Sequence, residues 1–221
     1  MCGRFAITLP NDAMAQLFSA RPANTLPAVP NFNVCPTNQV HVVRSDQAGR
    51  TLDPLRWGFI PHWYKSETAG PLLINARSET LAEKPAFRAA CRERRCLIVA
   101  TGFYEWMKTP NGDRLPWYIH RQDHAPIAFA GVWQNWGPDE NRQGTCAIVT
   151  TPANTRLGAI HHRMPLILEQ QDWPLWLGET GKGAARLMTP GAEDVLTYHR
   201  VDPVVNSNRA GGSSLIEPLV E

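Results

Sequence analysis

Long apolar runs are absent from the sequence, which has no stretch of about 18 apolar residues and no basic-then-apolar segment at its start. Neither a membrane-spanning helix nor a secretion signal is therefore predicted, and we expect a cytoplasmic protein. Cysteine is also scarce, because the chain has only five and no CxxC pair. Their odd number and their spacing predict neither a disulfide framework nor a metal site, and we expect no cofactor.

Charge of either sign is nearly balanced, since the formal net charge is +2 at pH 7. This balance argues against a basic coat over the whole surface, although it is compatible with a local basic patch. The most basic segment is 88–95, where four arginines fall within eight residues. We interpret it either as the solvated face of a helix or as a binding patch, with at least even weight on the first.

What the sequence does contain is many short apolar segments, separated by 19 prolines and 16 glycines. Few long helical periods occur, so this pattern predicts an α+β protein with a mainly antiparallel β core and helices around it. At 221 residues and without a visible linker, the chain is predicted to form a single domain over residues 1–221. Strands are predicted at residues 40–43, 55–59, 96–103, 117–120, 127–133, 146–150, 166–168 and 195–201.

Helices are predicted at three places, and one segment is predicted to be a loop. The first helix begins near Asn11 or Asp12 and is ended by Pro22. The second begins after Ser78, whose hydroxyl could cap it, and continues irregularly past Pro85 to about residue 94. A short helix is expected at 172–177. The Gly/Ser-rich segment 209–214 predicts a mobile surface loop.

Cys2 is the residue with the most distinctive chemistry, because its small side chain favours removal of Met1 and exposure of Cys2 as the first residue. Its α-amine and thiol, with ordinary pKa values near about 8 and 8.5, would then lie on adjacent carbons. Such an aminothiol condenses with an aldehyde to an imine, and the sulfur closes a five-membered thiazolidine on the imine carbon. The alternative is an ordinary buried thiol.

Glu105 lies among aromatic residues in the segment 102–106, and two polar residues, Asn75 and Arg77, directly follow the apolar run 71–74. Burial among aromatics would raise the pKa of Glu105 toward the range that is useful in acid–base catalysis. An exposed glutamate at the end of a strand is the slightly favoured alternative.

His161 and His162 are adjacent, between a turn and an apolar segment. Because neighbouring side chains of an extended segment face opposite ways, we expect at most one of them in a given pocket. The chain also has eight tryptophans, of which Trp57, Trp63 and Trp106 lie beside the polar motifs. Tryptophan stacks on unpaired bases but more often fills a core.

Four motifs taken together resemble the SRAP (SOS response-associated peptidase) family, from Cys2 to about Pro218. These motifs are Cys2-Gly3-Arg4-Phe5, Asn75-Ala76-Arg77-Ser78-Glu79-Thr80, Gly102-Phe103-Tyr104-Glu105-Trp106 and Ile160-His161-His162-Arg163-Met164-Pro165. Each alone is weak, but four in the same order are specific. The resemblance implies one SRAP domain with a barrel-like β core. Two departures are Cys35, where alanine is expected, and His162, where aspartate is expected.

The resemblance implies a DNA-damage protein that senses abasic sites in single-stranded DNA, including junctions between single and double strands. From the compactness of the chain, without a C-terminal extension, we expect a bacterial origin. Cys2 would form a covalent thiazolidine with the ring-opened C1′ aldehyde and so shield the site. Asn75 would hold the amine or the opened sugar, Glu105 would shuttle protons, and His161 would protonate the sugar ring oxygen. A weak AP-lyase activity by β-elimination and self-processing that removes Met1 are implied side reactions.

DNA binding is expected to be electrostatic, with Arg4 and Arg77 holding phosphates and with Trp57 and Trp63 covering or stacking on bases. A wedge against duplex DNA is expected near residues 84–85. We expect a monomer that contacts no membrane and associates with the nucleoid when bound to DNA.

Two other functions remain open from the sequence. Cys2, His161 and a carboxylate or amide could form a thiol-dependent peptidase, and the arginines and aromatics alone could form a non-catalytic single-stranded DNA-binding protein.

Overall fold

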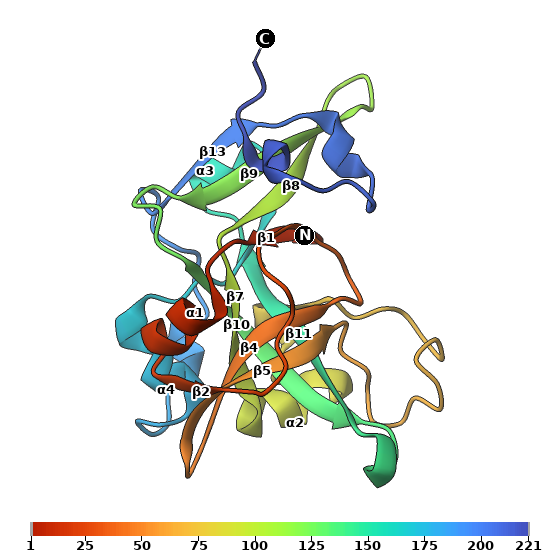
Figure 1. Ribbon diagram of the computed structural model, residues 1–221, viewed down its shortest axis with the longest axis vertical. Coiled ribbons are helices and arrows are strands. Elements are labelled where there is room, and N and C mark those ends of the chain that lie inside the picture. Colours follow the sequence, from red (N-terminus) through yellow and green to blue (C-terminus); the bar gives the residue numbers. More distant parts are fainter. Residues whose placement is uncertain (1, 221) are drawn as a thin grey trace.

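The computed structural model describes residues 2–220 as two sheets and a set of short helices (Figure 1). The strands are β1 (Phe5–Ile7), β2 (Ala20–Pro22), β3 (Asn31–Val34), β4 (Gln39–Asp46), β5 (Gly49–Trp57), β6 (Asn75–Arg77), β7 (Arg95–Ala100), β8 (Gly102–Lys108), β9 (Arg114–Arg121), β10 (Ile127–Trp136), β11 (Gln143–Pro152), β12 (Arg163–Pro165) and β13 (Leu196–Arg200). The α-helices are α1 (Asn11–Leu17), α2 (Pro85–Glu93), α3 (Thr155–Gly158) and α4 (Trp173–Leu177). None of the helices in this part of the chain has the length and apolar character needed to cross a membrane.

Five strands of the larger sheet close on themselves. Antiparallel pairing links β11 to β10, β10 to β7, β7 to β4 and β4 to β5, and parallel pairing of β5 with β11 completes the circuit. The remaining members of this sheet, β2, β6 and β12, pair with the circuit from outside it. The expected α+β fold with a mainly antiparallel, barrel-like core is therefore confirmed.

The second sheet has the strand order β13-β9-β8-β1-β3 and lies above the closed circuit in Figure 1. Aromatic side chains join the two sheets. The ring of Phe5 on β1 lies 5.0 Å from that of Trp57 and 6.0 Å from that of Phe129, and Phe103 lies 5.8 Å from Phe129. These four residues are at most 1% exposed, so the first strand of the chain is fixed by the centre of the core.

The helices lie on the outside and cover the sheets through a few large side chains. Trp173 of α4 stacks on Phe18 after α1, with ring centroids 4.3 Å apart, and Trp176 donates from Nε1 to the carbonyl of Cys96 on β7. Short 3₁₀ segments connect the other elements. They are Ser78–Thr80, Asp139–Asn141, Gln170–Asp172, Ala184–Leu187, Pro203–Asn206 and Ser213–Ile216.

The helix expected after Ser78 begins later. Residues Ser78–Thr80 form one 3₁₀ turn, and α2 begins at Pro85, the first-turn position where the missing N–H of proline is not needed. The Ser78 hydroxyl donates to the Glu79 carboxylate and caps no helix. The predicted strand 96–103 is two strands, β7 and β8, which belong to different sheets.

Two other segments differ from expectation in part. Strand β12 occupies 163–165, ahead of the predicted 166–168, where only Ile167 forms an isolated bridge with Phe129. The predicted loop 209–214 is irregular until the 3₁₀ turn that begins at Ser213, and the carbonyl of Ala210 accepts a hydrogen bond from Asn33.

Candidate active site around Cys2

Cys2 lies just before β1, which is an inner strand between β8 and β3. Phe5 pairs with Phe103, and the backbone N–H of Tyr104 donates to the carbonyl of Arg4 at 2.9 Å. Because β1 and β8 are antiparallel, this register directs the residues before Arg4 toward Glu105. Cys2 is 0% exposed, and Met1, whose removal we expect, lies outside the described residues.

Asn75 reaches Cys2 from the start of β6, which is held in place by parallel pairing with β11. Its Nδ2 donates to the carbonyl oxygen of Cys2 at 2.9 Å, across 73 positions of sequence. Its Oδ1 is buried and accepts no hydrogen bond from residues 2–220. Asn75 therefore fixes the backbone of Cys2 and keeps one acceptor available beside it.

Glu105 is buried on β8, with only 4% of its surface exposed, so the expectation of an exposed strand-end glutamate is wrong. Burial raises the pKa of Glu105, while the charge of His162 acts in the opposite direction. Burial and the Glu105 charge together raise the pKa of the Cys2 thiol well above its usual range. Cys2 is therefore a neutral thiol at neutral pH, with a carboxylate next to it.

His161 and His162 lie on the turn between α3 and β12, and their ring centroids are 4.4 Å apart. His161 is half-buried and His162 is exposed, so the expectation that at most one of them lies in a given pocket is not contradicted. His161 is half-buried, which lowers its pKa, and the backbone N–H of Arg163 donates to its Nδ1 at 3.0 Å. Nδ1 also lies 3.1 Å from the carbonyl oxygen of Arg163, so this nitrogen can accept from the Arg163 backbone in the neutral ring or donate to it when it carries a proton. The charge of His162 acts to lower the pKa of Glu105, so this histidine lies within electrostatic reach of the carboxylate.

An ion pair that the sequence did not reveal links the two sides of the site. The Arg163 guanidinium, with its side chain 8% exposed, binds both carboxylate oxygens of Glu79 and donates from Nη2 to the carbonyl of Thr150 at 2.7 Å. The hydrogen bonds from Arg163 lower the pKa of Glu79 to about 2. Since Glu79 follows β6 and Arg163 begins β12, the pair joins the Asn75 segment to the histidine turn across β11. The only sequence signal was that both residues belong to the family-like motifs.

The two predicted phosphate-binding arginines differ in their surroundings. Arg4 is half-buried and donates to Asn33 Oδ1 at 2.7 Å and to the carbonyl of Val205 at 2.9 Å, so part of its guanidinium supports the fold. Arg77 is exposed and forms no ion pair within residues 2–220. Its charge contributes to lowering the pKa of His162, which places Arg77 beside the histidines.

Trp57 is not available to DNA, and its predicted role on bases is wrong. It is 0% exposed, its ring packs on Phe5, and its Nε1 donates to the carbonyl of Ile74 at 3.0 Å. Trp63, by contrast, is 49% exposed and borders a cavity of about 540 Å³. The cavity is lined by Trp63, Leu73, Asn75, Arg77, Thr80, Lys84, Pro85, Ala86 and Phe87.

These positions define the class of the site. A buried thiol at the second residue is held by an amide and bordered by a buried carboxylate and an imidazole pair, and a cavity with an exposed tryptophan and a free arginine opens beside the amide. A thiol, an amide, a carboxylate and an imidazole pair are the types of group that a thiol-centred covalent site would need. Among residues 2–220, no three His, Cys, Asp or Glu side chains are grouped so that they could hold a metal ion.

Comparison with known proteins identifies the family. The model of the family described as SOS response associated peptidase (SRAP) matches residues 1–208, and the chain belongs to this family. It is 35% identical to the abasic site processing protein YoqW of Bacillus subtilis (strain 168) over 224 residues, which cover 98% of this chain and 99% of YoqW. It is 30% identical to the abasic site processing protein YedK of Escherichia coli (strain K12), with 99% and 100% of the two chains covered.

A solved structure shows the same fold. The crystal structure of a protein from Bacteroides thetaiotaomicron superposes with a TM-score of 0.87 and 23% sequence identity, and the match covers 99% of this chain and 100% of the other.

Proposed function

We propose that this protein processes abasic sites in DNA by forming a covalent thiazolidine between Cys2 and the C1′ aldehyde of the opened deoxyribose. The relatives YoqW and YedK are both named abasic site processing proteins. One observation carries the proposal: Cys2 is held between two polar residues. Asn75 donates a 2.9 Å hydrogen bond to the carbonyl of Cys2, and the charge of Glu105 is close enough to raise the pKa of the Cys2 thiol. With Met1 removed, both nucleophiles of Cys2 occupy this enclosed position.

The first bond forms between the α-amine of Cys2 and C1′. The amine adds to the aldehyde to give a carbinolamine, which loses one water to give the imine. This dehydration needs an acid for the departing hydroxyl and a base for the amine proton. Glu105 supports both roles, because its raised pKa brings its two protonation states closer to neutral pH.

The second bond closes the ring. The sulfur of Cys2 attacks the imine carbon, the thiol proton passes to the Glu105 carboxylate, and the imine nitrogen takes a proton and becomes a secondary amine. A base is required because the pKa of the buried thiol is raised, so little thiolate exists beforehand. The balance of both steps is protein plus DNA minus one water.

His161 is the group proposed to open the sugar. In the protonated ring, Nδ1 can donate to the carbonyl oxygen of Arg163 at 3.1 Å, and Nε2 carries the proton that is donated to the ring oxygen as the C1′–O4′ bond breaks. The low pKa that results from burial makes the protonated ring a strong acid for this step. The proximity of His162 provides a second imidazole for proton exchange with solvent.

DNA is proposed to enter over the cavity of about 540 Å³ beside Asn75. Arg77 is free to bind a phosphate, and Trp63 offers an exposed ring for a neighbouring base. Pro85 and Lys84 lie in the same cavity wall, which supports their assignment as a wedge against duplex DNA. Single strands and junctions are therefore the proposed substrates, with little preference for sequence.

The test uses protein that has lost Met1 and a single-stranded oligonucleotide with one true abasic site. A heat-stable adduct with the mass of protein plus DNA minus one water, mapped to Cys2, is the expected result. DNA with a tetrahydrofuran analogue, which cannot form the aldehyde, is the control and should give no adduct. If no adduct forms with the true abasic site, the covalent function is refuted.

Cys2→Ser separates the proposal from the two alternatives. The variant keeps the α-amine, so borohydride should trap its Schiff base with abasic DNA, but no stable adduct should form without the thiol. A non-catalytic single-stranded DNA-binding protein would give no trapped product with either residue. A thiol-dependent peptidase would cleave peptides without DNA and would lose that cleavage in Cys2→Ser.

A further inference from the structure

The basic segment 88–95 divides into two structural roles. Arg94 pairs with Glu93 at 3.1 Å, and Arg95 donates to the carbonyls of Cys91 and Arg92, near the end of α2. Arg95 also donates to the carbonyl of Trp176, near the end of α4. These two arginines satisfy carbonyls and a neighbouring carboxylate, so they have a structural explanation.

Arg88 and Arg92 have no such explanation. Both are exposed on α2, and neither forms an ion pair with any residue in 2–220; the same is true of Lys84, directly before the helix. The three positions are four residues apart. In a helix this spacing brings successive side chains to one side, about 6 Å apart along the axis, so the row extends over about 12 Å.

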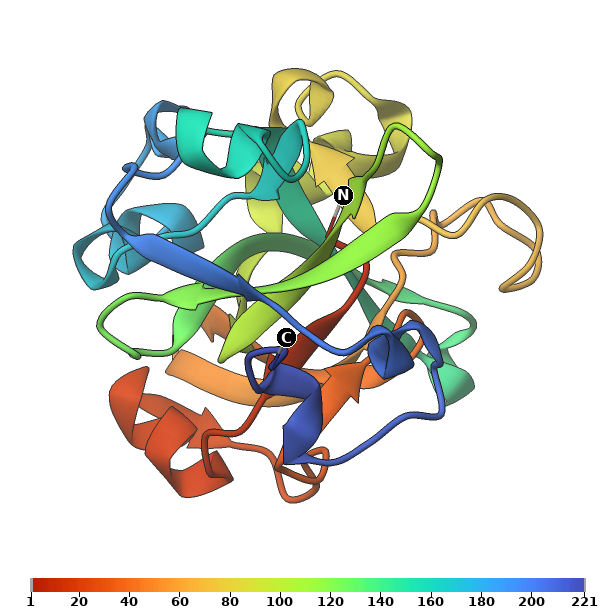
Figure 2. The same ribbon diagram turned by 90° about the horizontal axis from the view of Figure 1, so that it is seen from above.

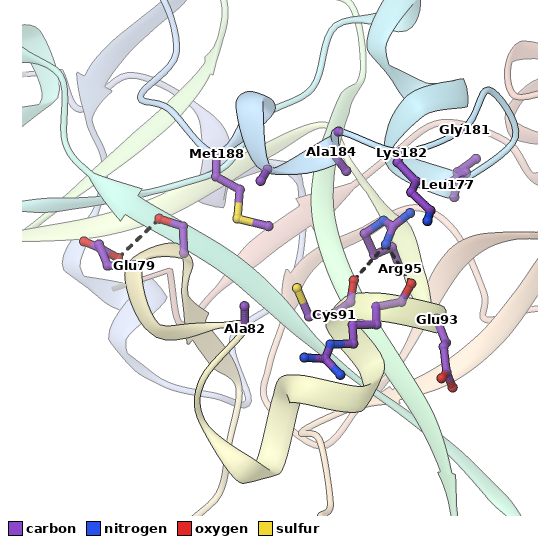
Figure 3. A pocket seen from close by; sticks show the side chains of 15 residues that line it. Glu79, Ala82, Cys91, Glu93, Arg95, Leu177, Gly181, Lys182, Ala184 and Met188 are labelled. Atoms are coloured by element: carbon purple, nitrogen blue, oxygen red, sulfur yellow. Dashed lines mark hydrogen bonds between the residues drawn. The ribbon is translucent and has the colours of Figure 1, made fainter.

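This basic row joins two cavities. Lys84 lines the cavity of about 540 Å³ that also contains Asn75 and Arg77. Arg92, at the other end, lines a second cavity of about 710 Å³ between α2 and the glycine-rich segment 178–183 (Figure 3).

The second cavity has an excess of unpaired positive charge. Figure 3 shows the side chains of Arg95 and Lys182 close together at one end of it. The two carboxylates that line the cavity are already bound, Glu79 by Arg163 and Glu93 by Arg94. An anion in this cavity would therefore relieve repulsion between cations without displacing an existing ion pair.

We infer that Lys84, Arg88, Arg92 and Lys182 form a track that binds the sugar–phosphate backbone of the DNA flanking the abasic nucleotide. A row of exposed, unpartnered cations beginning in the Asn75 cavity fits a polyanion that must continue away from the damaged nucleotide, because an abasic site has no base to hold. The inference rests on the proposed function for its choice of DNA. It adds that α2 contacts the phosphates of nucleotides that flank the abasic one.

The track is tested by the salt dependence of binding to a single-stranded oligonucleotide with a tetrahydrofuran site, which excludes covalent reaction. Each phosphate contact on a single strand contributes about 0.7 to the slope of log K against log salt. Arg88→Gln and Arg92→Gln should each lower the slope by about 0.7 and weaken binding about fivefold at 0.1 M salt, and the double variant about 25-fold.

Arg21→Gln is the matched control. Arg21 is an exposed arginine of β2 without an ion pair within the described residues, and in Figure 2 the segment that contains β2 and the yellow segment that contains α2 lie on opposite sides of the molecule. Its substitution should leave the slope unchanged. If the α2 variants match this control, or if the wild type does not bind the oligonucleotide, the track is refuted. Loss of adduct formation with a normal salt response would instead refute the proposed function alone.

Discussion

Glu79→Gln tests the ion pair that joins the two sides of the site. Glutamine keeps the shape of the side chain and one carbonyl oxygen, but it removes the charge that faces the Arg163 guanidinium. Arg163 has 8% of its side chain exposed, so water cannot replace the lost carboxylate, whereas Glu79 is 45% exposed. In the variant, the nearly buried guanidinium of Arg163 therefore loses its only carboxylate partner among the described residues.

The magnitude follows from the pKa of Glu79, which is lowered from 4.5 to about 2 by Arg163. At about 1.36 kcal/mol per unit, the full shift would correspond to roughly 3.4 kcal/mol, but the half-exposed carboxylate is screened, and we expect about 1–2 kcal/mol. Because the pKa is lower in the folded state, this stability is present above pH 4.5 and is lost as the pH falls toward 2.

The assay is urea denaturation of wild type and Glu79→Gln at pH 7 and at pH 3. The variant should be less stable at pH 7, and the difference should shrink at pH 3. Glu179→Gln removes a similar two-point pair, made with Arg50 at 2.7 and 2.8 Å, and is the control.

The control should lose stability but retain the cross-linking rate, whereas Glu79→Gln should also slow cross-linking, since Arg163 holds His161 through its backbone. Equal destabilisation of Glu79→Gln at both pH values, or an unchanged rate of adduct formation, would refute the reasoning.

Four further predictions concern Met1, Glu105 and two tryptophans. A retained Met1, enforced by an inserted residue that blocks its removal, should abolish adduct formation in the mass assay, because an amide nitrogen is not nucleophilic. Cross-linking by the wild type should weaken as the pH falls through a value above 4.5, since Glu105 has a raised pKa and must be deprotonated to accept the thiol proton; Glu105→Gln should be slow and should lack this acidic limb. Trp57→Ala should destabilise the fold by about 3–5 kcal/mol in denaturant titrations, because Trp57 is completely buried. Trp63→Ala should leave stability unchanged and weaken DNA binding by about 1–3 kcal/mol in anisotropy titrations.

The long strands of the barrel could be predicted from the sequence because most contain an apolar segment, such as 127–133 within β10. The three-residue strands β1 and β6 could not, since too few positions exist to show a period. Their places come from tertiary pairing with β8 and β11. The second helix was predicted too early because Ser78 is a good capping residue, yet Pro85 sets the first turn.

The residues of the site could be named from the motifs, but their contacts could not. Burial of Glu105 depends on how the two sheets cover it, and the sequence slightly favoured exposure. The two histidine rings meet because their turn is bent, which no local pattern indicated. Trp57 and Trp63 are close in sequence and both aromatic, and only the packed core separates the buried one from the exposed one.

The position of β1 has a consequence for the order in which the protein is made. Phe5 pairs with Phe103, so the first strand to leave the ribosome must wait for a neighbour that is synthesised 98 residues later (103 minus 5). If Met1 is removed during synthesis, as the proposed function requires, Cys2 would until then carry its free amine and thiol without Glu105 beside it. Under the proposed function, a nascent or prematurely terminated chain that lacks β8 would therefore expose an aldehyde-reactive aminothiol, and pairing of β1 with β8 would enclose it.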